Sequence, residues 1–242
     1  MEPKTHLDLF SGIGGFALAA RWAGLETIGF CEMDPYCQKV LAHHWPGVPI
    51  TEDVHDLDGR DFPGPFLLSG GFPCQPYSTA GQRRGEGDDR AIWPQMARVI
   101  SEAKPATVLG ENVAGLATMG LDDVLSDLEG MGYAVQTFCI PACAVDAKHR
   151  RDRLWIVAHG EGIGRDEFQD EDYRDLDRKK GIQVEAGGEG LSRDTEAGGA
   201  RWQVEPGVGR VAHGIPNRVD RLKGLGNAIV PQVAYELIRL MT

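Results

Sequence analysis

The residue best suited to covalent chemistry is Cys74, which lies in the segment Gly70-Gly71-Phe72-Pro73-Cys74-Gln75-Pro76. An apolar run at residues 66–69 leads into this segment, and the nearby prolines restrict φ and stiffen the backbone. A thiol on a stiff turn at the open edge of a sheet is placed as a nucleophile would be. Its reactivity would depend on thiolate formation, which basic neighbours favour. A loop cysteine of purely structural role is the alternative.

Charged side chains at two other strand ends could act beside such a thiol. Glu111 follows the apolar segment Thr107–Leu109, and it would face the same crevice as Cys74 if the two strands are neighbours. Arg151 and Arg153 precede another apolar segment, and strand alternation would place both guanidiniums on one face. Arginine suits fork-like binding of a phosphate or a base carbonyl. A solvated carboxylate and an exposed basic patch are the simpler alternatives.

A glycine-rich turn near the N-terminus indicates a ligand site. The segment Asp8-Leu9-Phe10-Ser11-Gly12-Ile13-Gly14-Gly15-Phe16 predicts a strand, a turn and the start of a helix. In an α/β sheet, ligands bind at this carboxyl edge of the strands. Glu32 ends the next predicted strand, where an acid would accept hydrogen bonds from ribose hydroxyls. Because the turn also fits Gly-x-Gly-x-x-Ala, a dinucleotide site is an open alternative.

The elements that must position these residues alternate between strands and helices. Apolar runs predict strands, and apolar residues at helical spacing predict helices. Together the alternation favours a mostly parallel sheet with helices on both faces. The predicted strands are His6–Phe10, Thr27–Cys31, Phe66–Ser69, Thr107–Leu109, Tyr133–Ile140 and Leu154–Ala158, and the predicted helices are Gly12–Ala23, Pro35–His44, Ile92–Ala103, Leu121–Met131 and Pro231–Leu240.

Composition limits the class of protein. A chain of 242 residues can form one large α/β domain with a small appendage. No apolar run is long enough to span a bilayer, and the N-terminus does not resemble a signal peptide, so a cytoplasmic location is expected. The net charge of -11 argues against a general nucleic-acid coat protein, but local basic clusters can still contact phosphates. One such cluster is Lys148–Arg153, and a looser one comprises Arg210, Arg218, Arg221 and Lys223.

The cysteines do not form a disulfide framework, and no spacing favours a metal site. Besides Cys74, we expect the other four to be buried, inert thiols because they lie in or beside apolar runs. These are Cys31, Cys37, Cys139 and Cys143.

Composition also divides the chain. Residues 1–158 carry the alternating pattern and are predicted to form the catalytic and cofactor-binding domain. Residues 159–205 are polar and rich in glycine and acidic residues, which fits either a solvated insertion or a small target-recognition module. Residues 206–242 form a C-terminal segment that ends in the predicted helix.

Five short motifs, taken in their order along the chain, resemble those of the DNA (cytosine-5) methyltransferases of bacterial or phage type. The resemblance is carried by the Asp8-Leu9-Phe10 turn, Pro73-Cys74-Gln75, Glu111-Asn112-Val113, Arg151-x-Arg153 and Gly226-Asn227-Ala228. It covers about the first 158 residues and the last 30 or so. It implies a Rossmann-like, S-adenosylmethionine-dependent methyltransferase fold of the α/β class, with a small variable target-recognition region and a C-terminal segment that returns to the catalytic domain.

The resemblance also implies roles for matching residues. Cys74 would attack carbon 6 of a flipped-out cytosine, Glu111 would hold and protonate ring nitrogen 3, and Arg151 and Arg153 would contact the base or a phosphate or support Cys74. Base flipping costs a few kcal/mol, and the segment from Ser78 to Arg90 is a candidate for the loop that closes over the base. The residues expected around S-adenosylmethionine are Phe10, Ser11, Gly12, Ile13, Gly15, Glu32, Met33, Asp53, Val54, Pro73 and Asn227, and no metal is expected.

Departures from the family pattern lie beside the basic pair. His149 stands where glutamine is usual, and Asp146 and Lys148 stand where glycine and proline are more usual. The alternatives are an RNA cytosine methyltransferase, whose Cys-Phe-Thr signature is absent from this sequence, a DNA-binding relative without activity, and a nicotinamide-dependent oxidoreductase. The expected partners are double-stranded DNA and a cognate restriction endonuclease. We expect the protein to be a monomer and not to bind a membrane.

Overall fold

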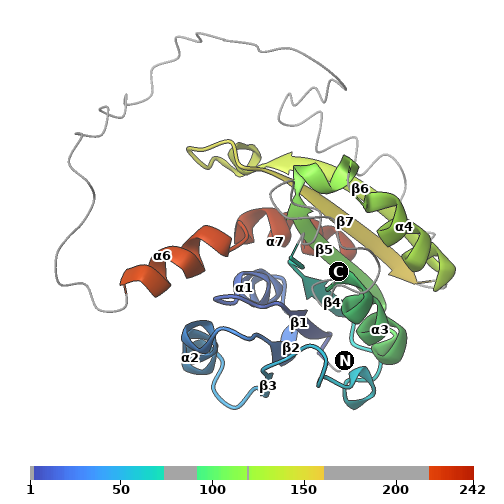
Figure 1. The fold of residues 1–242 in the computed structure, drawn as a ribbon, viewed down its shortest axis with the longest axis horizontal. Helices are drawn as coiled ribbons and strands as arrows, with labels where there is room; N and C mark the ends of the chain where they lie inside the picture. The colour runs from blue at the N-terminus through green and yellow to red at the C-terminus, as the bar shows by residue number, and fades with distance from the viewer. Residues whose placement is uncertain (1–2, 74–91, 119, 161–217) are drawn as a thin grey trace, which may run out of the picture.

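A computed structural model describes residues 3–73, 92–118, 120–160 and 218–242 (Figure 1). A sheet of seven strands forms its centre, with the strand order β3-β2-β1-β4-β5-β7-β6. The first five positions in this order pair in parallel, whereas β7 is antiparallel to both β5 and β6. The strands are β1 (Thr5–Leu9), β2 (Glu26–Cys31), β3 (Ile50–Thr51), β4 (Leu67–Gly70), β5 (Thr107–Val113), β6 (Tyr133–Pro141) and β7 (Asp152–Gly160).

Helices cover both faces of the sheet and bury two apolar layers. Buried residues of α3 (Trp93–Ala103) and α4 (Leu121–Gly130) share one layer with Leu7 and Leu9 of β1. On the other face, α1 (Gly15–Trp22) and α7 (Pro231–Met241) pack over Leu109 and Trp155. The α2 helix (Pro35–His44) and α6 (Arg218–Asn227) complete the helices of the described residues. Short 3₁₀ helices η1 (Gly59–Asp61), η2 (Ala114–Thr118) and η3 (Ala142–Val145) lie in the connections.

Near the carboxyl ends of the four parallel strands β2, β1, β4 and β5, one residue from each strand is paired in register with its neighbours to form a row. Leu9 pairs with Cys31 on one side and with Gly70 on the other, and Gly70 pairs with Gly110. The residues that follow this row in β1, β2, β4 and β5 therefore begin at the same edge of the sheet. They are Phe10, Glu32, Gly71 and Glu111, so the register gathers several predicted site residues.

The predicted strands and helices are confirmed, with shifts of a few residues at their ends. The structure adds β3 and α6, which the sequence pattern did not predict, and extends β5 beyond Glu111 to Val113. The expectation that Cys139 and Cys143 are buried is wrong: both are exposed, because β6 is an edge strand and η3 follows it at the surface. Cys31 and Cys37 are buried, as predicted. Within the described ranges, no helix is long and apolar enough to cross a membrane.

A chain of buried polar side chains runs beneath α1, across β2, β1 and β4. His6 Nδ1 lies 3.0 Å from Thr27 Oγ1, and His6 Nε2 lies 2.7 Å from Ser69 Oγ. The Ser69 hydroxyl donates to Asp8 Oδ1 at 2.9 Å, so it must accept from His6 Nε2–H. Burial disfavours the charged imidazole, so with Nε2–H donating to Ser69 the Nδ1 atom accepts from the Thr27 hydroxyl. Burial lowers the pKa of His6 to about 3 and raises the pKa of Asp8 to about 8.

These two shifts predict how the free energy of unfolding depends on pH. The raised pKa of Asp8 contributes stability below its ordinary pKa of 3.8, and this contribution is lost as pH rises toward about 8. The lowered pKa of His6 contributes stability above 6.5 that is lost as pH falls toward about 3. Between pH 6.5 and about 8 only the Asp8 loss operates, so stability should fall over that range.

Asp8→Asn should remove this alkaline slope, because the amide can accept from Ser69 without titrating. Denaturant unfolding at pH 6.5 and pH 8 measures the slope. Asp58→Asn is the matched control, since Asp58 is a surface carboxylate paired with Arg60, and it should unfold with the wild-type slope. An Asp8→Asn protein that loses as much stability as the wild type would contradict this account.

Candidate active site

The glycine-rich turn after β1 is tied to β2 by hydrogen bonds. The Ser11 N–H donates to the Cys31 carbonyl at 3.1 Å, and the Ser11 hydroxyl donates to the Asp8 carbonyl at 2.7 Å. Phe10 has a φ of 53°, which is uncommon for a residue with a side chain. The turn thus holds a constrained backbone at the carboxyl edge, between the sheet and the start of α1.

Glu32 links this turn to the start of α2. Its Oε2 accepts from the Gly12 N–H at 2.6 Å, and its Oε1 accepts from the Asp34 N–H at 2.7 Å. Each carboxylate oxygen has two acceptor sites, so Glu32 keeps capacity for hydroxyl donors after both amides are bound. The carboxylate is therefore fixed in orientation beside the glycine turn.

The surroundings of Glu32 fit a nucleoside ligand. A Cβ placed on Gly12 would meet no atom within 4 Å, so there is open space over the turn. Met33 is 68% exposed although its side chain is large and apolar, which suits contact with a flat ring. The Asp53 carboxyl is also accessible, and hydrogen bonds from the His55 backbone and ring lower its pKa. These residues could accept from ribose hydroxyls and from an amino group on a base.

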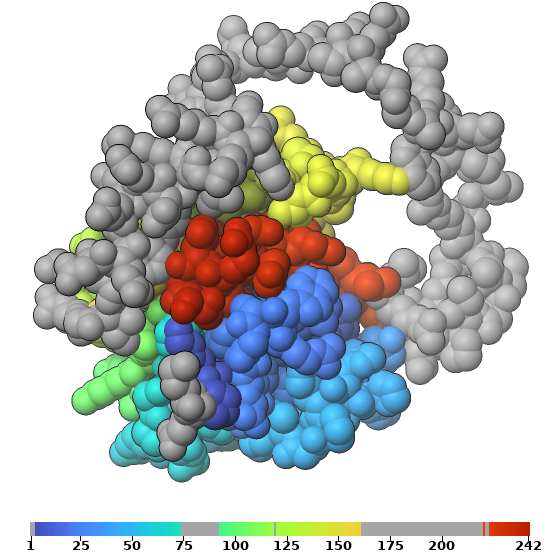
Figure 2. All heavy atoms as spheres, turned by 180° about the vertical axis from the view of Figure 1, so that it is seen from behind, coloured from blue at the N-terminus to red at the C-terminus, as the bar shows by residue number. Residues whose placement is uncertain are grey.

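The C-terminal segment returns to this edge. A Cβ on Gly15 would lie 2.6 Å from Ile229 Cγ1, so the missing side chain of Gly15 lets the linker between α6 and α7 approach α1. Lys223 of α6 pairs with Asp34 at 2.7 Å. Figure 2 shows this segment in red, in contact with the blue N-terminal part and below the yellow β6–β7 part. Asn227, expected from sequence to contact the cofactor, is exposed and is the last residue of α6.

Glu111 lies within β5 as a buried acid paired with Arg153 of β7. Its side chain is 11% exposed, and Arg153 Nε lies 3.0 Å from Glu111 Oε1. Burial raises the pKa of the Glu111 carboxyl, and the guanidiniums of Arg153 and Arg151 oppose that rise. A carboxyl whose protonated form is favoured by its surroundings can donate a proton to a ligand. The sequence indicated Glu111 only as a residue at a strand end, and the structure adds its burial and its partner.

Arg151 occupies a different position from the one expected. Its Nη2 donates to the Ala228 carbonyl at 2.7 Å, and both Nη1 and Nη2 donate to the Gly226 carbonyl, at 3.2 and 3.1 Å. Its backbone has a φ of 39°, so the local conformation is not the extended one assumed from strand alternation. The guanidinium therefore joins the start of β7 to the C-terminal end of α6, close to Glu111 and Arg153.

Asn112 is a buried polar residue that sequence reasoning did not assign to the site. Its Nδ2 donates to the Phe72 carbonyl at 2.9 Å, and its Oδ1 accepts from the Val113 N–H at 2.8 Å. The hydrogen bond to Phe72 fixes the backbone just before Pro73 to the end of β5. Its position directly after Glu111 is the one signal in the sequence that could have indicated it.

Cys74 and the expected closing loop from Ser78 to Arg90 lie outside the described residues, as do residues 161–217, which include most of the predicted variable region. The described residues before this gap end at Pro73, two positions after Gly71, which lies at the common edge of the sheet. A Cβ on Gly71 would lie 3.6 Å from Glu111 Oε2. The backbone that leads into Cys74 therefore passes close to the Glu111 carboxyl.

Residues 5–190 match the model of the family described as C-5 cytosine-specific DNA methylase. The chain is 33% identical over 190 residues to the type II methyltransferase M2.BsuMI of Bacillus subtilis, covering 73% of this chain and 48% of that protein. It is 28% identical over 185 residues to M.HgiCII of Herpetosiphon aurantiacus, covering 74% of this chain and 42% of that protein.

The chain thus spans less than half the length of each of these two relatives. Among solved structures, it resembles a putative DNA modification methyltransferase encoded within a prophage of E. coli, with a TM-score of 0.56 and 24% identity over 65% of this chain and 47% of that one. That likeness supports the fold, which is the α/β methyltransferase fold expected from the sequence.

Proposed function

Because this chain belongs to the C-5 cytosine-specific DNA methylase family, we propose that it methylates carbon 5 of cytosine in double-stranded DNA. The observation that carries the proposal is the common sheet edge, where the glycine turn with Glu32 and the Glu111–Arg153 pair follow one row of paired residues. This edge offers a nucleoside site on one side and a buried acid on the other. The backbone that leads into Cys74 runs between them.

S-adenosylmethionine would supply the methyl group as an electrophilic carbon on a sulfonium. The residues that would hold it are Glu32, Met33 and Asp53, with Phe10, Ser11, Gly12 and Ile13 in the glycine turn, Val54 next to Asp53, and Asn227 and Pro73 beside the turn. Gly15 would contribute by packing against Ile229 rather than by touching the ligand. Space over Gly12 and acceptors with remaining capacity support this assignment.

Cys74 and Glu111 would act on the cytosine ring from the other side of the site. The Cys74 thiolate adds to carbon 6, while the Glu111 carboxyl donates to ring nitrogen 3 and stabilises the added electron pair. Carbon 5 would then be nucleophilic and would form a bond to the methyl carbon as the sulfur–methyl bond breaks and S-adenosyl-L-homocysteine leaves. Loss of the carbon 5 proton to a base re-forms the double bond and expels the Cys74 thiolate. Arg153 orients Glu111, and Arg151 holds the C-terminal end of α6 against the edge.

Transfer of tritiated methyl groups by the purified chain tests this proposal. Duplex DNA and transfer RNA are offered separately, and the labelled nucleoside is identified after digestion. Label in DNA as 5-methylcytosine supports the proposal, whereas label in RNA alone would favour the RNA methyltransferase alternative. No label in either nucleic acid, with folded protein, would favour a relative without activity.

We also propose that the protein acts in the cytoplasm as a monomer, and that it is paired with a cognate restriction endonuclease.

A further inference from the structure

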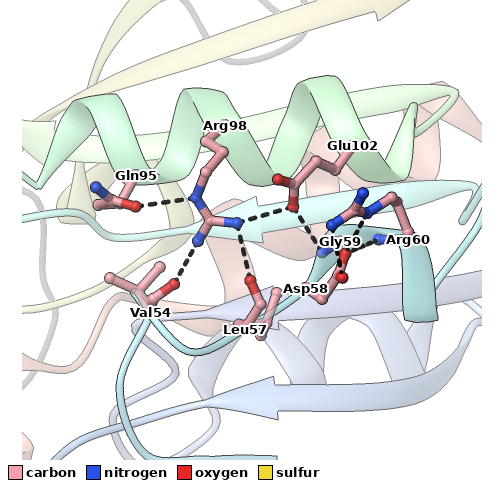
Figure 3. A network of polar contacts seen from close by, with 8 residues as sticks. All are labelled: Val54, Leu57, Asp58, Gly59, Arg60, Gln95, Arg98 and Glu102. Atoms are coloured by element: carbon pink, nitrogen blue, oxygen red, sulfur yellow. Dashed lines mark hydrogen bonds and ion pairs between the residues drawn. The ribbon is translucent and has the colours of Figure 1, made fainter.

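One arginine of α3 binds the loop that follows β3. Arg98 Nη2 donates to the Val54 carbonyl at 2.7 Å, and Arg98 Nη1 donates to the Leu57 carbonyl at 3.0 Å (Figure 3). Its Nη1 also donates to Glu102 Oε2 at 2.8 Å, and its Nε donates to Gln95 at 3.0 Å. The planar guanidinium presents its donors in a fixed geometry, so these contacts define the position of the loop.

The same network extends to the next turn of the loop. Glu102 Oε2 accepts from the Gly59 N–H at 2.9 Å as well as from Arg98 (Figure 3). Gly59 also packs tightly, since a Cβ there would lie 2.7 Å from the Val99 carbonyl. The side chains of Arg98 and Glu102 are 32% and 22% exposed, so the pair is largely shielded from water. Helix α3 therefore holds the loop from residue 54 to residue 59.

This loop carries Asp53 at the cofactor side of the sheet edge. Val54 and Leu57 are buried in the core beneath it, whereas the Asp53 side chain is 46% exposed. The nearer carbonyl that Arg98 binds belongs to Val54, the residue after Asp53, so the guanidinium fixes the backbone next to this carboxylate. The Arg98 guanidinium donates to acceptors of the protein itself, two of them backbone carbonyls, so its contribution to ligand binding would be indirect.

Helix α3 also contacts the strand that leads to Cys74. A Cβ on Gly70 would lie 3.1 Å from Met96 Cε, and the rings of Phe72 and Trp93 have centroids 5.2 Å apart. One helix therefore packs against the end of β4 through Met96 and Trp93 and holds the Asp53 loop through Arg98. It sets the spacing between the two sides of the site.

We propose that Arg98 is a positioning residue for cofactor recognition: by holding the Val54 and Leu57 carbonyls, it keeps Asp53 aimed at the adenine amino group of S-adenosylmethionine. This inference rests on the proposed function. Asp53, as a carboxylate, accepts a hydrogen bond from an amino group and is repelled by a carbonyl at the same position. Arg98 thereby contributes to discrimination between adenine and a base that carries oxygen instead of the amino group.

Binding of two product analogues tests the inference without turnover. Isothermal titration gives the dissociation constants of S-adenosyl-L-homocysteine and S-inosyl-L-homocysteine, which differ by the replacement of the amino group with oxygen. The wild type should prefer the adenosyl compound by about 10-fold or more, as expected when a buried or directed polar contact is lost. Arg98→Met should weaken binding of the adenosyl compound by about 10-fold and bring the preference close to one.

Two further variants separate positioning from stability and charge. Arg60→Met removes an arginine that pairs with Asp58 on the surface near the same loop, and it should keep the wild-type preference. Arg98→Lys keeps the positive charge but lacks the planar guanidinium with its paired donors. Its preference for the adenosyl compound should therefore lie between those of the wild type and Arg98→Met. If Arg98→Met does not fold, Arg98→Lys decides the question by the same ratio.

The possible outcomes distinguish a failure of the role proposed for Arg98 from a failure of the proposed cofactor site. If the wild type binds neither compound, the proposed cofactor site fails and the inference fails with it. If the wild type prefers the adenosyl compound and a folded Arg98 variant keeps that preference, the inference alone is overturned. A reduced preference in the Arg98 variants, with the Arg60 variant unchanged, supports it.

Discussion

Cys74→Ala is expected to abolish methyl transfer while leaving cofactor binding nearly unchanged. The thiolate makes the bond to carbon 6 that turns carbon 5 into a nucleophile, and alanine cannot make it. Loss of a nucleophile acting with a general acid lowers turnover by several orders of magnitude, here about 10⁴-fold or more. Tritiated methyl transfer to duplex DNA measures turnover, and titration with S-adenosyl-L-homocysteine measures binding.

Duplex DNA containing 5-fluorocytosine gives this prediction a second readout. Because carbon 5 then carries fluorine in place of the proton that must leave, the Cys74 adduct cannot be released and should appear as a stable protein–DNA band. Cys74→Ala should form no such band. Cys143→Ala is the matched control, since Cys143 is an exposed thiol in η3, and it should trap DNA as the wild type does. A Cys74→Ala protein with normal turnover would contradict the assignment.

Glu111→Gln is expected to lower kcat by about 10²–10⁴-fold, the range for loss of a general acid. The amide keeps the size of the side chain and can contact ring nitrogen 3, but it cannot transfer a proton. The dissociation constant for S-adenosyl-L-homocysteine should change little, because the contacts of Glu111 are with Arg153 on the base side of the edge. Single-turnover kinetics with saturating DNA measure the effect.

The pH dependence of the wild type gives Glu111 a separate test. Burial raises the pKa of its carboxyl, so the protonated fraction persists to higher pH than in an exposed glutamate and declines as pH rises. The Glu111→Gln variant should lack the decrease in kcat with rising pH that this loss of the proton causes in the wild type. Glu236→Gln, at an exposed carboxylate paired with Arg239, should keep both the rate and the profile. A Glu111→Gln variant with wild-type kcat would remove Glu111 from the mechanism.

The sequence predicted the centre of the sheet well because β1, β2 and β4 are largely apolar runs that are followed closely by glycine or a charged residue. Two elements escaped prediction for physical reasons. The β3 strand has only two residues, too few for a pattern. The α6 helix contains Gly224, which disfavours a helix, yet a Cβ there would lie 3.1 Å from Ile13, so close packing against the glycine turn requires glycine.

The sequence proposes the residue types of the site but does not give their pairings. Cys74, Glu111 and the arginines were recognised from motifs, whereas the direction of each guanidinium depends on contacts between distant segments. Arg151 donates to carbonyls 75 and 77 positions away, and Arg98 donates to carbonyls 41 and 44 positions away. Backbone carbonyls have no signature in the sequence, so these partners appear only once the chain is folded.

The central claim is that this chain methylates carbon 5 of cytosine in DNA, and bisulfite sequencing of host DNA tests it most directly. The protein is expressed in a host that lacks cytosine methylation, and cytosines that resist conversion are mapped. The account predicts protected cytosines that disappear when Cys74→Ala is expressed at the same level. Complete conversion of the DNA despite folded, S-adenosyl-L-homocysteine-binding protein would contradict it.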